Sequence, residues 1–275
     1  METKRPYWLS ALMYAGALGL MLLAIGPAVW LVGIALSDNT VPLNRLPGPN
    51  EMTLRNFSGA WAEGGLLRAL INSILVTVAQ TVLNVILAAL AAYPLARMKF
   101  RGRGLLFVLV LSTLMVPEQV IVVPLFRTVV GMGLYDTLIA VVLPFSVTAF
   151  GIYLCRQAFL AIPDELEEAA RLDGANALQV WRHVMLPLTG PTLATLAVFS
   201  VIGAWSNLLW PLIVLQEAEN FTLPVALNQL MGVFASNQRY AYAGAVLAVL
   251  PVVVKTPLRR KLNLMLSLQQ LVVLN

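Results

Sequence analysis

The sequence predicts an all-α, polytopic membrane protein with six transmembrane helices. Of its 275 residues, 59% are hydrophobic and only 11% are charged, whereas about a quarter of the residues of an average soluble domain are charged. The apolar residues form runs long enough for spanning helices, which need about 20 residues each. The basic residues gather in short segments between these runs, as the cytoplasmic loops of membrane proteins do. These three observations together place the chain in a lipid bilayer.

Six apolar runs give the predicted spans. They lie at residues 9–36, 69–96, 104–127, 135–158, 187–216 and 240–258. The first run is longer than the about 7 to 15 apolar residues of a signal peptide, so we interpret it as a retained span. After Val254 the sequence becomes KTPLRRKLNLMLSLQQLVVLN. It leaves open whether the sixth span continues through Pro257, or whether the tail is an altered reading frame or an amphipathic helix on the membrane surface.

The distribution of positive charge predicts the orientation. Thirteen of the 18 Lys and Arg residues lie in the N-terminal segment, the two even-numbered loops and the tail. By the positive-inside rule these segments are cytoplasmic, and so are both termini. The longest external segment, residues 37–68, is expected to fold over the mouth of the protein or to meet an external partner.

Composition also excludes several function classes. The net charge of +5 fits the positive loops of a membrane protein, so nucleic acid is not an expected partner. A single cysteine, Cys155, and a single histidine, His183, exclude a disulfide framework and a His-rich metal cluster. The sequence contains no GxxxxGK[ST] segment, so it lacks the phosphate-binding loop of an ATPase.

One strongly charged segment, residues 162–187, separates the fourth and fifth spans. Pro163 suits the start of a helix, and Gly174 suits the left-handed turn that ends one. Four acidic residues complement the positive end of the helix dipole; they are Asp164, Glu165, Glu167 and Glu168. A second short helix is expected at about residues 175–184, before Pro187 opens the next span.

This segment is predicted to dock on a protein. Leu172, Val180 and Trp181 are expected as apolar knobs, and exposed apolar patches rimmed by charge usually mark interfaces. Acidic residues outnumber Arg by five to two between Asp164 and Arg182. An anionic lipid surface would repel such a helix, because helices that lie on membranes carry mostly Lys and Arg.

The segment resembles the EAA motif of the permease subunits of bacterial ABC importers. The family pattern is Glu-Ala-Ala, three residues, Gly, nine residues, Ile, one residue and Leu-Pro. Every spacing is kept, with Val in place of Ile; the matching residues are Glu168, Ala169, Ala170, Gly174, Val184, Leu186 and Pro187.

Further segments resemble the carbohydrate-uptake branch, in particular the smaller permease of the maltose transporter and the glycerol-3-phosphate transporter permease. These segments are Asn72-Ser73, residues 91–103, residues 115–126, and Trp205 with Asn207 and Pro211. The resemblance covers residues 56–254 and implies a single transmembrane permease domain over residues 1–275, with its core at residues 69–254.

The resemblance implies a transport function in which this chain itself catalyses no reaction. Glu168, Ala169, Ala170 and Gly174 would form the cytoplasmic coupling helix that contacts an ATPase, with Trp181 at a position usually aromatic. The chain would be no enzyme and would hold no cofactor, while ATP and Mg would be bound by a partner ABC ATPase dimer. A homologous second permease and an extracytoplasmic substrate-binding protein complete the expected assembly in the bacterial inner membrane.

Three residues are candidates for the translocation path. Glu118 is the only carboxylate inside an apolar run, and such a group must face protein or water; it lies either on the path or at a loosened helix near the outer boundary. Trp205 and Asn207 offer a surface that suits sugars, although both also fit a packing role. In this branch the second permease can hold most of the transported molecule, so no sugar-binding residue is predicted here.

Two other function classes compete with this interpretation. A secondary transporter driven by an ion gradient would use Glu118 as a proton site, but it gives no reason for the EAA spacing. An intramembrane hydrolase lacks a base, because His183 lies in the cytoplasmic segment. The resemblance leaves sugars, oligosaccharides and glycerol phosphates or their diesters as substrates.

Overall fold

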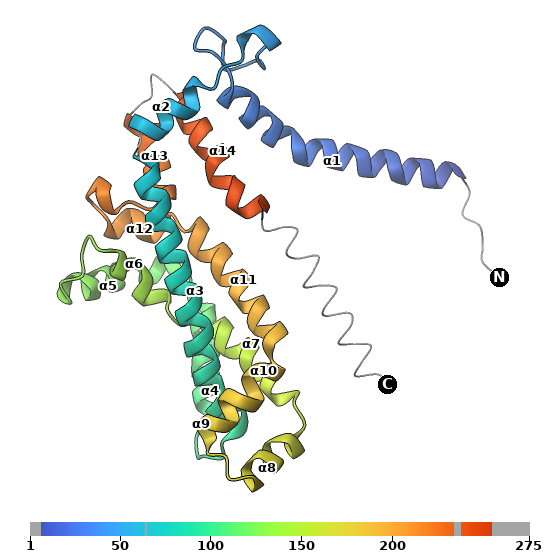
Figure 1. Cartoon of the computed structure of the whole chain (residues 1–275), viewed down its shortest axis with the longest axis vertical. Helices are drawn as coiled ribbons and strands as arrows, with labels where there is room; N and C mark the ends of the chain where they lie inside the picture. The colour runs from blue at the N-terminus through green and yellow to red at the C-terminus, as the bar shows by residue number, and fades with distance from the viewer. Residues whose placement is uncertain (1–6, 64, 234–237, 255–275) are drawn as a thin grey trace. The chain divides into compact units, whose positions relative to one another are not determined.

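The computed structural model describes residues 7–63, 65–233 and 238–254 (Figure 1). In these residues every regular element is helical, and the only β pairing is an isolated bridge between Ser37 and Met52. The predicted all-α class is therefore confirmed for the described part of the chain. The chain separates into two compact units, one within residues 1–66 and 226–253 and the other at residues 67–225.

The first unit contains the N-terminal helix and the segment expected outside the membrane. Its elements are α1 (Tyr7–Ala35), the 3-10 turn η1 (Pro49–Glu51), α2 (Arg55–Glu63), most of α13 (Leu223–Val233) and α14 (Gln238–Val254). Only 6% of the most apolar stretch of α1 is buried by this chain. A helix that is apolar all round and so exposed fits a lipid environment.

Buried hydrogen bonds hold the segment after α1 in place. The Asn56 side chain donates to the carbonyls of Ala35 and Ser37, at 2.9 and 2.7 Å. From α14, the buried Arg239 donates to the Ser37 hydroxyl at 2.9 Å and to the Val41 carbonyl. These bonds satisfy backbone groups at the end of α1, where a helix leaves carbonyls without partners.

An ion pair closes the turn at η1. Arg45 donates two hydrogen bonds of 2.7 Å to the carboxylate of Glu51, which also accepts from the Gly48 backbone at 2.8 Å. The Arg45 hydrogen bonds, followed by the one from Gly48, lower the pKa of Glu51 to about 2. This clamp is therefore charged on both sides at any pH above about 3.

The second unit is built on α3 (Leu66–Arg97). This helix has 32 residues, so it is about 48 Å long, longer than the about 30 Å core of a bilayer. The further elements of the unit are α4 (Arg103–Ser112), η2 (Thr113–Met115), α5 (Glu118–Gly131), α6 (Leu138–Val142), η3 (Leu143–Phe145), α7 (Ala149–Leu160), α8 (Asp164–Leu172), α9 (Ala177–Val180), the π turn η4 (Trp181–Met185), α10 (Leu186–Leu188), α11 (Gly190–Ser206), α12 (Leu209–Val214) and η5 (Ala218–Asn220).

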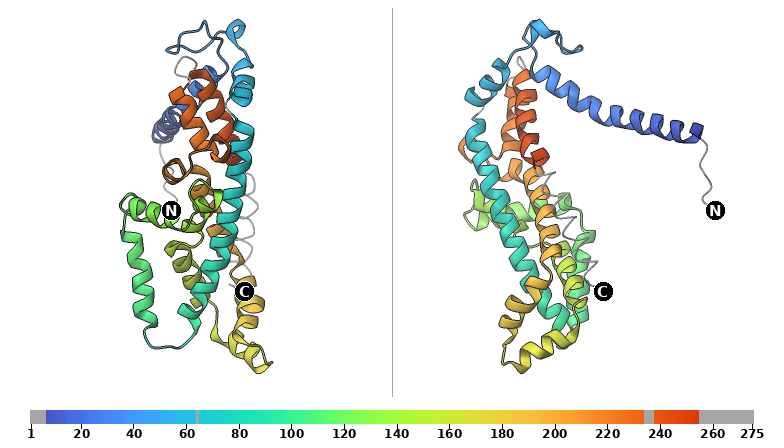
Figure 2. Two further views of the ribbon diagram at one scale, coloured as in Figure 1. Left: turned by 90° about the vertical axis from the view of Figure 1, so that its left-hand side faces the viewer. Right: turned by 45° about the vertical axis from the view of Figure 1, so that its right-hand side comes forward.

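The predicted third span, residues 104–127, is not one helix. The chain bends by 104° between residues 103–115 and α5. The change of direction is visible between the two green helices in the left view of Figure 2. Pro117 stands at the break and Val116 before it is extended, because a proline disfavours the helical conformation of the preceding residue. The continuous apolar run concealed this break.

The predicted fourth and fifth spans are also interrupted. The fourth bends by 43° before α7, and residues 177–188 and α11 meet at 80°. Pro187 lies inside the helical stretch that ends at Leu188, so it does not open the fifth span as predicted. A second break follows at Asn207, which is extended and accepts a hydrogen bond from the Trp210 backbone.

The six-span count is consequently not confirmed. By length and composition, two described helices can each cross a membrane alone, and up to five spans result if each bent pair is one span. The predicted sixth span corresponds to α14, which has 17 residues. Its expected continuation to residue 258, and the tail beyond, lie outside the described residues.

Two apolar clusters form the core of the second unit. One packs around the C-terminal half of α3, and its most buried members include Ala88, Ala92, Cys155, Phe159, Val180 and Met185. The other packs nearer the N-terminal end of α3 and includes Val76, Val129, Val141, Trp210 and Val214. The part of α3 between Val76 and Ala88 therefore lies between two tightly packed regions.

Candidate functional site

The charged segment at residues 162–187, here called the coupling segment, folds as two helices joined at Gly174. The first helix, α8, begins directly after Pro163 and carries its acidic residues in the first turn. Gly174 has a φ of +87°, a left-handed conformation that costs residues with a side chain about 1 to 2 kcal/mol. Asn176 and Gln179 cap the next helix reciprocally, at 3.0 and 2.8 Å. The predicted helix end at Gly174 is confirmed.

A buried ion-pair cluster fixes α8 to the end of α3. Glu167 is buried and accepts hydrogen bonds from the Tyr93 hydroxyl at 3.2 Å and from Arg171 at 2.8 Å. The Arg97 guanidinium, whose side chain is 6% exposed, pairs with Asp164 and lies 3.8 Å from Glu167. The hydrogen bond from Arg171 to Glu167 raises the pKa of Arg171, which keeps its charge at neutral pH.

Arg97 also closes the turn before α8. It donates to the carbonyl of Phe159 at 2.5 Å and to that of Ile162. Close by, Arg156 donates to the Leu95 carbonyl at 3.0 Å. The two loops predicted to be cytoplasmic therefore meet at one end of the second unit, the lower end in Figure 1.

The predicted coupling residues divide into exposed and anchored ones. Glu168, Ala169 and Gly174 are exposed, and Ala170 packs partly against the core cluster. Trp181 is half-buried and its indole Nε1 donates to the Ala89 carbonyl of α3 at 3.2 Å. The segment thus has an exposed outer surface and an anchored part, here called its root, in which Glu167 and Trp181 bond to α3.

Of the three expected apolar knobs, one has the predicted exposure. Leu172 is 89% exposed at the end of α8, whereas Val180 is fully buried and Trp181 faces α3. The sequence concealed this because each short helix carries apolar residues that could point either way. Which of them points outward depends on where the helices lie against α3.

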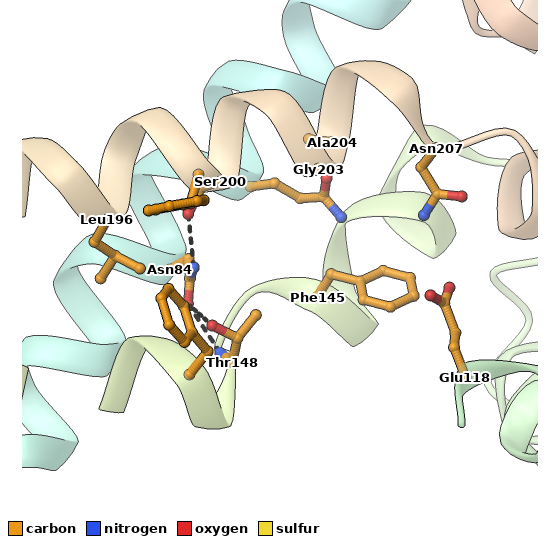
Figure 3. Close-up of a pocket in the computed structure, with 12 residues that line it drawn as sticks. Asn84, Glu118, Phe145, Thr148, Leu196, Ser200, Gly203, Ala204 and Asn207 are labelled. Carbon is orange, nitrogen blue, oxygen red and sulfur yellow. Dashed lines mark hydrogen bonds between the residues drawn. The ribbon is translucent and has the colours of Figure 1, made fainter. Parts of the chain in front are cut away.

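A cavity of about 250 Å³, lined by both polar and apolar side chains, lies in the second unit, bordered by α3, α11 and the breaks in the other spans. Figure 3 shows its lining. Its polar side chains are Gln80, Asn84, Glu118, Thr148, Ser200 and Asn207. Gln80 and Asn84 are one turn apart on α3, between Val76 and Ala88 of the two core clusters. The cavity therefore interrupts an otherwise apolar interior.

Asn84 joins three helices at the cavity. Its amide donates to the Ser200 hydroxyl of α11 at 2.7 Å, and its oxygen accepts from the Thr148 backbone at 2.8 Å and the Thr148 hydroxyl at 3.2 Å (Figure 3). The Thr148 hydroxyl in turn caps α7 by accepting from Gly151 at 3.1 Å. This network connects the break before α7 to α3 and α11.

Two of the three predicted path residues line this cavity. Glu118 stands at the start of α5 directly after the break, and its carboxylate points toward Asn207 (Figure 3). One Glu118 oxygen, Oε1, is buried without a hydrogen-bond partner in the described structure. Trp205 is half-buried and is not among the lining residues.

Sequence reasoning missed the residues that hold both regions together. Glu167 was assigned only to the helix dipole, yet it forms the buried cluster with Arg97. Gln80 and Asn84 were not singled out, although a polar stripe at helical spacing on α3 is visible in the sequence; its members are Ser73, Thr77, Gln80 and Asn84. Polar groups on one face of an apolar span are a signal of a buried site.

Comparison with known proteins identifies the family of the chain. Residues 66–258 match the family model of the binding-protein-dependent transport system inner membrane component. The chain is 33% identical over 259 residues to the arabinooligosaccharides transport system permease protein AraQ of Halalkalibacterium halodurans, covering 92% of this chain and 93% of that protein. It is 34% identical to the trehalose transport system permease protein SugB of Mycobacterium tuberculosis, over 84% and 86% of the two chains.

Other relatives extend the range of substrates and supply a solved fold. The sn-glycerol-3-phosphate transport system permease protein UgpE of Yersinia pestis is 31% identical over 86% of this chain and 88% of its own. A chain of a bacterial ABC transporter involved in the import of the acidic polysaccharide alginate superposes with a TM-score of 0.81. It has 25% identity, and the match covers 95% of this chain and 99% of the other.

Proposed function

The chain belongs to the family of binding-protein-dependent transport system inner membrane components, and we propose that its coupling segment transmits ATP-driven motion to a carbohydrate path. It is a membrane-embedded permease subunit of an ABC importer and not an enzyme. Family membership removes the secondary transporter and the intramembrane hydrolase as readings of the sequence. The permease subunits of this family have no cofactor of their own.

The observation that carries the proposal is the two-faced coupling segment. Its exposed face presents Glu168, Ala169 and Leu172 beside Gly174, so a carboxylate and an apolar side chain stand next to small residues that a cleft in an ATPase can approach closely. Its buried face is tied to α3 by Glu167 and Trp181. Ala170 and Trp181 therefore contribute by fixing the segment, while the exposed residues make the contact.

A rigid root supports a mechanical role. Charge-assisted hydrogen bonds are roughly twice as strong as neutral ones, and two of them join α8 to α3, from Tyr93 to Glu167 and from Arg97 to Asp164. A push on the exposed face would move α3 as a body rather than bend a loop. Alternating access then follows from rotation of packed elements between discrete arrangements.

The proposed transporter also requires partner subunits. ATP and Mg bind to a partner ATPase dimer, and a homologous second permease forms the other half of the path. A substrate-binding protein docks outside; a structural relative was solved in complex with a periplasmic protein bound to an alginate pentasaccharide. Its TM-score of 0.66 at 16% identity shows a shared fold.

The proposed topology treats the bent pairs at residues 103–131 and 138–160 as one span each. Together with α1, α3, α11 and α14 they give six crossings of one permease domain over residues 1–275, with core 69–254. Both termini and the coupling segment face the cytoplasm of a bacterial cell, because the basic loops require it. The segment at residues 37–63 faces outward.

A sugar or a related polyol phosphate is the proposed substrate class. Relatives carry names for arabinooligosaccharide, trehalose and sn-glycerol-3-phosphate transport. Glu118 and Asn207 line the cavity of the second unit and are the proposed path residues, with Trp205 beside them on α11. Polar groups at membrane depth commonly mark a substrate path.

The test is substrate-stimulated ATP hydrolysis by the complex reconstituted with its partner subunits. Glu168→Lys and Gly174→Asp should leave assembly intact and lower the stimulated rate by about tenfold or more, because each disturbs the exposed face. Gly102→Asp is the matched control. Gly102 has the same φ of +87° and equally open space for a Cβ, so both glycine variants bear the same backbone strain.

The control separates coupling from folding. If Gly102→Asp lowers stimulation as much as Gly174→Asp, the effect is strain and not loss of a contact. Unchanged stimulated hydrolysis and uptake in both coupling variants would show that the segment does not couple ATP hydrolysis to transport.

A further inference from the structure

We propose that the cavity at Glu118 holds one ring of an uncharged sugar and rejects phosphorylated or carboxylated substrates. This inference rests on the proposed function, and it narrows the substrate class and assigns a binding role to this subunit. It is carried by the hydrogen-bonding groups that line the cavity, by their charge and by the size of the space.

The cavity offers both acceptors and donors that the described protein leaves unused. Gln80 uses its amide nitrogen on the Val141 carbonyl at 3.2 Å, and its oxygen has no partner in the described structure. Asn207 uses its oxygen to accept from Trp210, which leaves its amide nitrogen free to donate. The Ser200 hydroxyl accepts from Asn84, so its hydrogen is also free to donate.

These amide orientations are fixed by their partners. A backbone N–H must meet the Asn207 oxygen, and a carbonyl must meet the Gln80 nitrogen. A sugar hydroxyl both donates and accepts hydrogen bonds. A mixed set of fixed donors and acceptors around one space therefore suits a polyhydroxylated ligand.

Glu118 places a carboxyl group in the cavity wall. Its Oε1 atom is buried without a partner in the described structure and borders the cavity. A buried polar group without a partner destabilises the protein, and more so if it is charged, so a hydroxyl that donates to it removes this penalty. Neither protonation state of a carboxyl group supplies positive charge for a phosphate or a uronate.

No opposite charge compensates for Glu118 in the lining. None of the described residues that border the cavity is Lys, Arg or His. Sites that recognise phosphate or carboxylate use such groups, most often the fork of Arg. An anionic substrate would here meet a carboxyl group and amides but no cation.

Size and apolar faces agree with a single ring. The cavity of about 250 Å³ is just below the about 300 Å³ at which pockets for drug-sized ligands begin. Three aromatic side chains complete its wall: Phe145, Phe150 and Phe199. The rings of Phe150 and Phe199 pack edge to face, with their centroids 5.5 Å apart. They can pack against the C–H face of a sugar while the polar groups meet its hydroxyls.

The test is equilibrium binding to the purified permease and ATPase complex without its binding protein, so that only the membrane subunits select. The neutral probes are radiolabelled trehalose, maltose and arabinotriose, and the anionic probes are sn-glycerol 3-phosphate and trigalacturonate. The wild-type complex should bind a neutral probe at least about tenfold more tightly than either anionic probe. Glu118→Gln keeps the shape and should weaken neutral binding about tenfold, because the amide replaces one of the two carboxyl oxygens with a nitrogen that cannot accept a hydrogen bond.

Glu217→Gln is the matched control, since Glu217 is an exposed carboxylate outside the cavity lining. It should leave all affinities unchanged. Equal binding of anionic and neutral probes, no binding of any neutral probe, or identical affinities for wild type and Glu118→Gln would each overturn the assignment. ATP-driven uptake by the full complex with its binding protein is measured in parallel, so a failed importer function is recognised separately from a failed cavity assignment.

Discussion

Glu167 and Glu168 are adjacent in the sequence but have opposite surroundings. Glu167 is buried against Tyr93, Arg97 and Arg171, whereas Glu168 is exposed on the outer face of α8. One carboxylate stabilises the root of the coupling segment and the other is available to a partner. Stability and coupling should therefore separate between two neighbouring residues.

We expect Glu167→Ala to lower the free energy of unfolding by about 2 to 3 kcal/mol, because it leaves Arg97 buried with fewer partners. Glu168→Ala should change it by less than about 0.5 kcal/mol, as exposed substitutions usually do, while reducing stimulated ATP hydrolysis. Thermal unfolding of the purified complex and its ATPase rate measure the two effects. Equal destabilisation by both substitutions would contradict the division into root and contact surface.

At the scale of elements, α3 and α7 pack closely through small residues. A Cβ atom at Gly151 would lie 3.0 Å from the Ala88 side chain and from the Thr148 hydroxyl, and 3.2 Å from the Asn84 oxygen. Small residues let helix backbones approach in membranes. The Asn84 network that borders the cavity depends on this approach.

Gly151→Val should therefore destabilise the protein by about 1 to 3 kcal/mol, the usual cost of overpacking, and weaken sugar binding by moving Asn84. Gly104→Val in α4 is the control, because a Cβ there meets no atom within 4 Å. Both substitutions carry the same helix propensity, so the difference in unfolding temperature reports packing alone. A similar loss at both positions would mean that α3 and α7 do not depend on close contact.

At the scale of the whole molecule, the orientation in the membrane rests on charge. Cys155 is buried and is the only cysteine of the chain. The protein without an introduced cysteine should therefore react little with a thiol-labelling reagent. Ser58 on α2 and Asp173 after α8 are both exposed. The proposed topology places them on opposite sides of the membrane.

In intact cells or sealed spheroplasts, Ser58→Cys should react with a membrane-impermeant maleimide, and Asp173→Cys should react only after the membrane is opened. The expected difference is at least about tenfold in labelling, because a bilayer excludes the charged reagent. Labelling of Asp173→Cys from outside, or protection of Ser58→Cys, would reverse the orientation or change the number of crossings.

The sequence alone was sufficient for the helical class, the two long spans and the helix end at Gly174. Composition and run length report burial in lipid directly, and a glycine after an acidic helix start is a local signal. The signals for both ends of α8, from Pro163 to Gly174, lie within this one fragment of the sequence. For the same reason the spacing of the EAA pattern was readable without a structure.

Only the tertiary structure decided where the spans break, which apolar residues of the coupling segment face outward, and which polar residues meet. Within a continuous apolar run neither burial nor periodicity changes at a bend; Pro117 marks a possible break, but the sequence does not give its angle of 104°. Asn84 and Ser200 are 116 residues apart, and their hydrogen bond depends on the packing of α3 against α11. Local chemistry determines elements, whereas a cavity forms only where distant elements leave polar groups facing one another.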